Sequence, residues 1–396
     1  MDKSVKHRHG MFPERALKCA VSEMKSMTAV VLIIASEMLA LGCSGSSTSS
    51  GDEDRIVAGV NLTELFQLPT AAEREDVIGD WTSLTHAAVG VSTVSQTAVS
   101  LGGTTATLRI VSHSVGANTH FGAVLSPDNA GSGTLPVVVY LHGGDDGVDV
   151  SELLTVLPIA LGSSQDDYVY LVPSFRAEEL RYSGVTYTST GQASPWDRDV
   201  DDVLSLIDAA ITIVPAADPE RVGVVGFSRG ACVAMIAGIR DPRIDLVIEF
   251  FGPTDFFSPW SEDIFADALD GSLRDLPGLS TLNEDIIQPL KNGGLSNASA
   301  RLEMLRRSPV YFVDMLPPTQ AHHGTVDNVV PVTEAELLRA AFTAGGLSSP
   351  DHTVYIYTGG GHSPLTLLGS FERARGFLGR LTNPSRSIAV GDTPND

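Results

Sequence analysis

The segment Gly226-Phe227-Ser228-Arg229-Gly230 is a G-x-S-x-G motif, and it is the part of this sequence most able to do chemistry. An apolar run at residues 222–227 predicts a strand before it, and residues 228–239 predict a helix after it. A serine on such a strand-to-helix turn exposes its hydroxyl, and the glycines let the two elements pass closely. We therefore predict that Ser228 is a nucleophile. The alternative is a tight turn that happens to carry an exposed serine.

A serine hydroxyl is a weak nucleophile and needs an adjacent base. In a strand–serine–helix context the expected chain order is serine, acid, histidine. His362 follows three glycines after the last predicted strand, which makes it the best candidate base. Asp327, in the loop after the seventh predicted strand, is the acid expected to orient the imidazole, and Asp255 is the alternative acid. Together these residues predict acyl transfer through an acyl-enzyme, which needs no cofactor.

An oxyanion formed during acyl transfer needs backbone N–H donors near the nucleophile. The glycines of His142-Gly143-Gly144 end the third predicted strand and are candidates, although a plain turn is the alternative. The backbone N–H of Arg229 is the expected second donor. The side chains of Arg176 and Arg229 are either substrate contacts or structural partners, and we favour the structural interpretation.

These residues need a scaffold, and the hydrophobic pattern predicts one. Strand-like runs occur at residues 107–111, 121–125, 137–142, 168–172, 222–227, 246–250, 319–323 and 353–357. Helical patterns lie at residues 195–213, 228–239, 333–344 and 364–379, the first with Ser194 as N-cap, Pro195 at the first position and Asp197 completing a capping box. Strands that alternate with helices predict a doubly wound, mostly parallel α/β sheet.

The longest interruption of this pattern, residues 255–309, predicts a helical cap inserted after the sixth strand. Ligands bind at the carboxyl edge of such sheets, where the cap would lie. We expect Phe256, Phe257 and Trp260, together with His142, to line a substrate pocket. The alternative is that the aromatic residues only pack the insertion onto the sheet.

The N-terminus resembles a bacterial lipoprotein signal. Residues 27–41 form an apolar run behind basic residues, too short to span a membrane comfortably. The run ends in Gly42-Cys43, and residues 44–51 are a Ser/Gly-rich tether. The resemblance implies lipidation of Cys43 and a membrane-anchored protein of the cell envelope, facing the periplasm or the exterior. An ordinary secretory signal or a cytosolic start are the alternatives.

The resulting organisation is a signal peptide at 1–42, a tether at 43–55, an N-terminal extension at 56–100, a catalytic domain at 101–385 and a tail at 386–396. The formal net charge of −22 makes nucleic acid an unexpected partner, because an acidic surface repels phosphates. The three cysteines do not form a disulfide pattern, and Cys232 is expected to be a buried apolar side chain. The pair His322-His323 lacks further ligands at metal-binding spacing, so no metal is expected.

Residues 121–378 resemble the prolyl oligopeptidase and dienelactone hydrolase branch of the α/β hydrolases. The matching stretches are VVVYLHGG at 137–144, PSFRA at 173–177, DVDDVLSL at 199–206, DPERVGVVGFSRG at 218–230, GPTDF at 252–256, and residues 308–309, 323–331 and 360–363. The resemblance implies the α/β-hydrolase fold and a Ser228–His362–Asp327 triad.

Hydrolysis of a carboxylic ester is the preferred activity, with a short peptide or aminoacyl amide as the alternative substrate. Peptidases of the resembled family often carry a large propeller domain in front of the hydrolase domain. The roughly 50 residues between tether and domain cannot build a propeller with blades of ~40 residues, so peptidase activity is less favoured. A non-catalytic lipoprotein that binds a ligand on the same scaffold is the alternative from another class. The complete triad argues against it.

Overall fold

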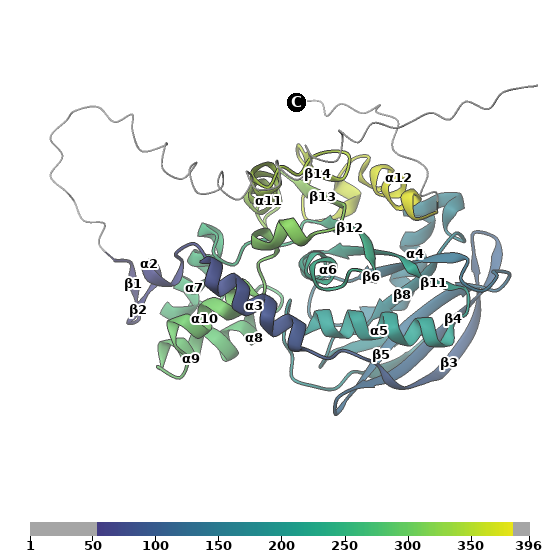
Figure 1. The fold of residues 1–396 in the computed structure, drawn as a ribbon, viewed down its shortest axis with the longest axis horizontal. Helices are drawn as coiled ribbons and strands as arrows, with labels where there is room; N and C mark the ends of the chain where they lie inside the picture. Colours follow the sequence, from purple (N-terminus) through teal and green to yellow (C-terminus); the bar gives the residue numbers. More distant parts are fainter. Residues whose placement is uncertain (1–53, 383–396) are drawn as a thin grey trace, which may run out of the picture. The chain divides into compact units, whose positions relative to one another are not determined.

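The computed structural model describes residues 54–382, whose centre is a nine-stranded sheet (Figure 1). The strand order is β14-β13-β12-β11-β6-β8-β5-β4-β3, and the six strands from β14 to β8 run parallel to their neighbours. The remaining pairings, β8 to β5 to β4 to β3, are antiparallel. The strands are β3 (Val89–Leu101), β4 (Thr104–Val115), β5 (Asn118–Pro127), β6 (Leu135–Leu141), β8 (Val169–Pro173), β11 (Ala217–Phe227), β12 (Ile244–Phe250), β13 (Thr319–Gly324) and β14 (His352–Tyr357).

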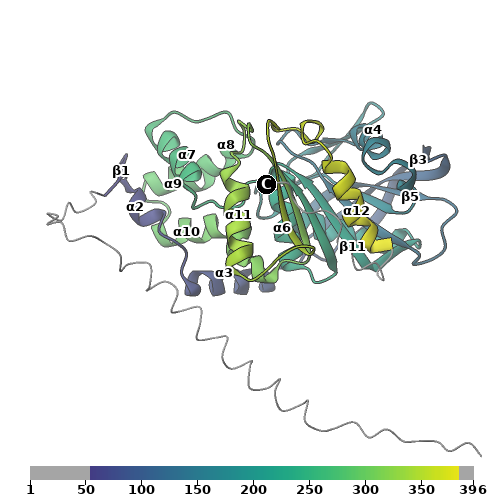
Figure 2. The ribbon, with the colours of Figure 1, turned by 90° about the horizontal axis from the view of Figure 1, so that it is seen from above.

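Helices cover both faces of this sheet (Figure 2). One face carries α5 (Asp199–Ile213), α6 (Arg229–Arg240) and α11 (Thr333–Ala344), and the other carries α4 (Val150–Leu161) and α12 (Ser370–Thr382). On β11, Val222 and Val224 belong to the core under the first face, whereas Val225 and Phe227 pack under the second. Burial on both faces explains the unbroken apolar runs in the sequence. The predicted doubly wound, mostly parallel α/β fold is confirmed.

The predicted start of α5 is wrong. The helix begins at Asp199 rather than at residue 195, its N-cap position is Arg198, and no side chain caps it. Trp196 has a left-handed backbone with φ 63°, and its N–H donates to Asp199 Oδ2 at 2.9 Å. The Ser194 hydroxyl lies 3.3 Å from Asp197 Oδ2 and does not cap a helix. Tertiary contacts of Trp196, described below, therefore override the local capping signal.

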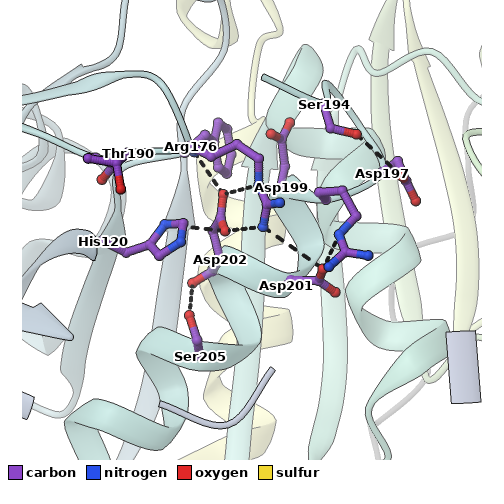
Figure 3. Close-up of polar contacts among 12 residues, drawn as sticks. His120, Arg176, Thr190, Ser194, Asp197, Asp199, Asp201, Asp202 and Ser205 are labelled. Atoms are coloured by element: carbon purple, nitrogen blue, oxygen red, sulfur yellow. Dashed lines mark hydrogen bonds and ion pairs between the residues drawn. The ribbon is translucent and has the colours of Figure 1, made fainter. Parts of the chain in front are cut away.

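Three buried aspartates in the first turn of α5 are each paired with arginine. Arg176 donates to Asp202 at 2.6 Å, beside His120, and Arg240 donates to Asp201 at 2.6 Å. Figure 3 shows the carboxylates of Asp199, Asp201 and Asp202 together at this helix end. Carboxylates are favourable at a helix N-terminus, and burial makes their pairing obligatory. Arg176 thus has the structural role that the sequence favoured.

The other predicted helices agree closely with the structure. α11 has the predicted bounds, and α6 ends one residue beyond the expected end. The region predicted as one helix at 364–379 contains a short 3-10 turn, η5 (Pro364–Thr366), and then α12. Gly369, with φ 80°, separates the two.

The insertion at residues 255–309 is largely helical and follows β12, the sixth predicted strand. Its helices are α7 (Pro259–Asp270), α8 (Leu279–Leu282), the π-helix η3 (Asn283–Ile287), α9 (Gln288–Lys291) and α10 (Asn297–Leu305). A further 3-10 helix, η4 (Pro309–Met315), leads to β13. A separate small sheet joins β7 (Val148–Asp149), β9 (Glu179–Tyr182) and β10 (Val185–Thr188).

The N-terminal extension packs on the insertion and joins the central sheet. β1 (Ile56–Val57), β2 (Val60–Asn61), α2 (Leu62–Leu65) and α3 (Ala71–Ser83) precede β3. Arg301 of α10 donates to Glu73 of α3 at 2.6 Å and to the carbonyls of Leu65 and Gln67. The predicted boundary at residue 101 therefore falls at the end of β3, inside one structural unit.

The predicted signal peptide, the tether as far as residue 53, with Cys43, and the whole predicted tail lie outside the described residues. Between residues 54 and 382, no helix has the length and apolar character needed to span a membrane.

Candidate active site

Ser228 occupies a strained turn between β11 and α6. Its backbone has φ 54° and ψ −118°, and its N–H donates to Phe250 O at 2.9 Å. Such a conformation costs of order 1–3 kcal/mol for a residue other than glycine, and it concentrates at functional sites. A Cβ on Gly226 would lie 2.1 Å from Gly230 O, and one on Gly230 would lie 2.5 Å from the carbonyl oxygens of Leu141 and His142. The glycines of the motif are therefore required by close backbone packing.

His362 and Asp327 form a hydrogen-bonded pair at the carboxyl edge of the same sheet. The Nδ1–H of His362 donates to Asp327 Oδ2 at 2.7 Å. Their two loops are joined by backbone bonds, from Val326 N to Gly360 O at 2.9 Å and from Thr325 N to Tyr357 O at 2.9 Å. A Cβ on Gly324 would lie 2.1 Å from Gly360 O, so these loops can approach only because Gly324 has none. The imidazole is held with Nδ1 protonated, which leaves Nε2 as an acceptor.

The environment of Asp327 favours its ionised form. Burial opposes ionisation, but the hydrogen bond from His362 and those from the backbone N–H groups of Val329 and Val330 outweigh it. They hold the pKa of Asp327 below its ordinary value. The neighbouring His323 is fully buried, burial lowers its pKa, and its Nε2–H donates to Val330 O at 2.9 Å. An ionised Asp327 can both orient His362 and stabilise an imidazolium.

Contacts of Phe251 connect the His362 loop with the serine turn. The Phe251 ring lies 4.4 Å from the His362 ring and 6.2 Å from that of Phe227, the residue before Ser228. In the described part of the chain no hydrogen bond joins Ser228 to His362. Catalytic hydrogen bonds often tighten only in the complex with substrate.

Asp255, the alternative acid, has different partners. Its Oδ1 accepts from Phe257 N at 2.8 Å, and its Oδ2 accepts from the Tyr311 hydroxyl at 3.1 Å. Burial raises the pKa of Asp255 to about 6. Asp255 therefore anchors the start of the insertion, and the carboxylate that contacts His362 is that of Asp327.

The loop after β6 lies against the serine turn. A Cβ on Gly143 would lie 3.0 Å from Ser228 Cβ, and Gly144 has φ 77°. The Nδ1–H of His142 donates to Gly143 O at 2.9 Å. Gly143 and the first residue of α6, Arg229, thus adjoin Ser228, and Gly144 follows Gly143 in the same loop. The Arg229 guanidinium is buried among Asp199, Glu178 and the ring of Phe175, in agreement with the structural interpretation of this side chain.

A cavity of about 590 Å³, including its open mouth, adjoins Ser228 and lies beneath the insertion. Phe256 and Trp260 line it, as expected from the sequence. The rest of its wall is mainly apolar and consists of Trp196, Arg229, Pro253, Ser261, Ile264, Phe265, Leu276, Pro277, Leu279, Leu282, Val329 and Val330. An apolar group attached to a carbonyl at Ser228 could enter it.

Two expected pocket residues do not line this cavity. Phe257 packs against Tyr311 of η4 at 5.8 Å and against Phe66 of the N-terminal extension at 6.5 Å, so it joins the insertion to the rest of the chain. Its neighbour Phe256 has the opposite orientation and contacts Trp196. His142 is buried, with its ring 4.6 Å from that of Phe175. Both side chains are buried in the interior instead of lining this cavity.

Sequence reasoning missed Trp196 as a cavity residue. Its ring meets that of Phe256 at 5.3 Å, and a Cβ on Gly278 would lie 2.7 Å from its Cη2 atom. The insertion thus closes directly over this indole. The only local signal is the Pro195-Trp196 pair before the Asp-rich start of α5, and it also fits the first turn of a helix.

The remaining histidines near the site are occupied by protein groups. His322 bonds to the Tyr357 hydroxyl at 2.7 Å and to Gln320 Oε1 at 2.9 Å. Among residues 54–382 no group of three or more His, Cys, Asp or Glu side chains could hold a metal ion.

Comparisons with known proteins place this geometry in a known fold. No protein-family model matches the sequence. No curated protein sequence matches it either. Acetyl xylan esterase 1 from Thermoanaerobacterium sp. JW/SL YS485 matches structurally with a TM-score of 0.54 and 15% identity, over 81% of this chain and 99% of its own. The acetyl xylan esterase from Paenibacillus sp. R4 gives a TM-score of 0.52 and 16% identity, with the same 81% and 99% coverage.

The acylaminoacyl peptidase of Pyrococcus horikoshii matches with a TM-score of 0.49 and 16% identity, over 76% of this chain and 44% of that chain. At such identities a structural match establishes the fold alone. The sheet order, the strained serine turn and the matches to the two acetyl xylan esterases agree: this chain has the α/β-hydrolase fold.

Proposed function

We propose that this protein is a serine hydrolase that cleaves carboxylic esters. The observation that carries the proposal is the Asp327–His362 hydrogen bond of 2.7 Å at the same sheet edge as the strained Ser228 turn. Four parallel strands of the sheet carry the proposed catalytic residues in the loop after the strand: Gly143 and Gly144 after β6, Ser228 after β11, Asp327 after β13 and His362 after β14.

The reaction proceeds in two steps. Ser228 Oγ attacks the ester carbonyl while His362 Nε2 accepts the hydroxyl proton, and the imidazolium then protonates the departing alcohol. Water attacks the resulting acyl-enzyme, with His362 again acting as base. Asp327 holds the imidazole orientation throughout and stabilises its charged form. Backbone N–H groups of Arg229 and of the Gly143–Gly144 loop stabilise the oxyanion.

The cavity beneath the insertion suggests the kind of substrate. Its wall is dominated by aromatic and aliphatic side chains, including Trp196, Phe256 and Leu279. Apolar walls favour groups that bury hydrocarbon surface, at about 25 cal/mol per Å². We therefore favour an ester whose acyl or alcohol part is apolar. The structural neighbours named as acetyl xylan esterases are consistent with ester chemistry.

Substitution of the nucleophile tests the proposal. Ser228→Ala should reduce hydrolysis of p-nitrophenyl esters by about 10³-fold or more and abolish labelling by a fluorophosphonate. Ser151→Ala, on the exposed surface of α4, is the control and should behave like the wild type. A parallel panel of aminoacyl p-nitroanilides would reveal a peptidase. Wild-type protein that neither hydrolyses nor becomes labelled would refute the enzyme assignment and favour a ligand-binding role.

A further inference from the structure

The side chain of Arg229 links the serine turn to three other segments of the chain. Its Nε and Nη2 donate to the two oxygens of Asp199 on α5, at 2.8 and 2.9 Å. Its Nη1 donates to Glu178 Oε1 and, at 3.2 Å, to Gly144 O. Only 2% of the side chain is exposed. The Gly144 contact is significant because this loop is expected to hold the oxyanion.

Glu178 extends the same cluster to the other glycine of the loop. Its second oxygen, Oε2, lies 3.6 Å from Nε2 of the buried His142. His142 in turn donates from Nδ1 to Gly143 O at 2.9 Å. Burial lowers the pKa of His142 to about 4, so the imidazole is neutral. We place its single proton on Nδ1, because Nδ1 faces a carbonyl oxygen whereas Nε2 has no hydrogen-bond partner within residues 54–382. Gly144 O is therefore bonded to Arg229 and Gly143 O to His142, and the His142 ring lies beside Glu178 in the same buried cluster.

Holding these carbonyls also fixes the amide hydrogens that would face the substrate. A peptide bond is planar, so the C=O of one residue and the N–H of the next point in opposite directions. The contact of His142 with Gly143 O thus sets the direction of the Gly144 N–H. The Arg229 bond to Gly144 O sets the next peptide unit, which carries the Asp145 N–H, and so holds Gly144 from its other side. Glycines resist such ordering more than other residues because they lose more backbone freedom. An oxyanion donor stabilises the transition state only when its direction is set before the reaction.

We infer that the Arg229 side chain is a positioning residue for the oxyanion hole, acting directly on the Gly143–Gly144 loop. The same residue thus supplies one donor from its backbone and orients the loop that supplies the other. The inference rests on the proposed function. The bidentate bond to Asp199 gives the guanidinium a fixed direction, which a lysine ammonium at this position would lack.

The test compares two buried arginines at opposite ends of α6. Arg229→Met removes the contact with the loop. Arg240→Met is the matched control, because the Arg240 side chain is 3% exposed and pairs with Asp201 of α5. We would measure the melting temperature, kcat and KM with a p-nitrophenyl ester, and amide hydrogen exchange of residues 142–147. Arg229→Lys completes the set.

We expect Arg229→Met to lower kcat by about 10²-fold, comparable with the loss of one oxyanion donor, while KM changes by less than about threefold. Exchange of residues 142–147 should become faster. Arg229→Lys should recover part of kcat, and Arg240→Met should lower the melting temperature without either effect. The inference is overturned if Arg229→Met and Arg240→Met have the same kcat and the same exchange.

If Arg229→Met does not fold, Arg229→Lys decides, because a lysine keeps the buried charge but cannot donate to Asp199, Glu178 and Gly144 together. A fall in kcat of roughly tenfold with faster exchange supports the inference, and unchanged kcat and exchange refute it. Failure of the proposed function is a separate result. It would show as hydrolysis that survives Ser228→Ala, whereas the exchange measurement does not depend on activity.

Discussion

The substitution Asp327→Asn separates the role of this carboxylate from that of a general structural acid. Asp327 Oδ1 accepts two backbone hydrogen bonds, from Val329 N at 2.9 Å and Val330 N at 3.0 Å. An asparagine has one acceptor oxygen, and these two donors would bind it. The amide NH₂ would then face His362 Nδ1, where Asp327 Oδ2 now accepts at 2.7 Å.

An NH₂ donor at this position stabilises the wrong tautomer of His362. The proton would move to Nε2, which could no longer accept the proton of Ser228. A loss of about 10⁴-fold in kcat is expected from such a change, or roughly 5 kcal/mol in the activation barrier. The fold should be retained, because both backbone hydrogen bonds to the side-chain oxygen persist.

Asp255→Asn is the matched comparison, since Asp255 is a buried carboxylate bonded to Phe257 N and Tyr311. We expect this variant to lose less than about tenfold in kcat. Both variants would be assayed with the same p-nitrophenyl ester, after circular dichroism has confirmed folding. The reasoning fails if Asp327→Asn retains more than a tenth of wild-type turnover or if Asp255→Asn is the more damaging change.

Three further predictions concern the pocket, the buried acid behind the serine turn and the N-terminus. Trp260→Ala should shift kcat/KM towards longer acyl chains, by up to about fourfold per added methylene. The control Phe257→Ala should leave the chain-length profile unchanged. If Trp260→Ala also leaves this profile unchanged, the acyl pocket lies elsewhere. Burial raises the pKa of Glu249 from its ordinary value of 4.5 to about 8. Between these two values the unfolded chain loses the proton while the folded chain keeps it, so the free energy of unfolding falls as pH rises from about 5 to 8. Glu249→Gln should therefore match the wild type in urea unfolding at pH 5 and exceed it by about 4 kcal/mol at pH 8, and a constant difference would contradict this. We propose that Cys43 is lipidated, so Cys43→Ala should release the protein from the membrane fraction of a bacterial host. An intact-mass measurement that finds an unmodified N-terminus on the mature protein would contradict this proposal.

A strand or helix could be predicted from the sequence where its own residue pattern reflects its burial, and not where distant contacts determine its bounds. Strands β6 and β8 are buried on both faces, so nearly all their residues are apolar and both strands are recognisable in the sequence. β3 lies at the sheet edge with most side chains exposed, and its many serines and threonines gave no comparable signal. The start of α5 was misjudged because Ser194 and Pro195 satisfy a local capping rule. The contacts of Trp196 with the distant insertion determine the backbone there instead.

The sequence by itself determined the serine turn and the order of the candidate catalytic residues. The serine turn is encoded locally, because the backbones of strand and helix nearly touch there and require Gly226 and Gly230 within a few residues of Ser228. Tertiary structure alone decided that His362 contacts Asp327 rather than Asp255, and that Phe256 faces the cavity while its neighbour Phe257 faces the interior. Those outcomes depend on the pairing of β13 with β14 and on how the insertion closes over Trp196. Contacts between segments so far apart in the chain leave no periodicity in either segment, so only the assembled fold could reveal them.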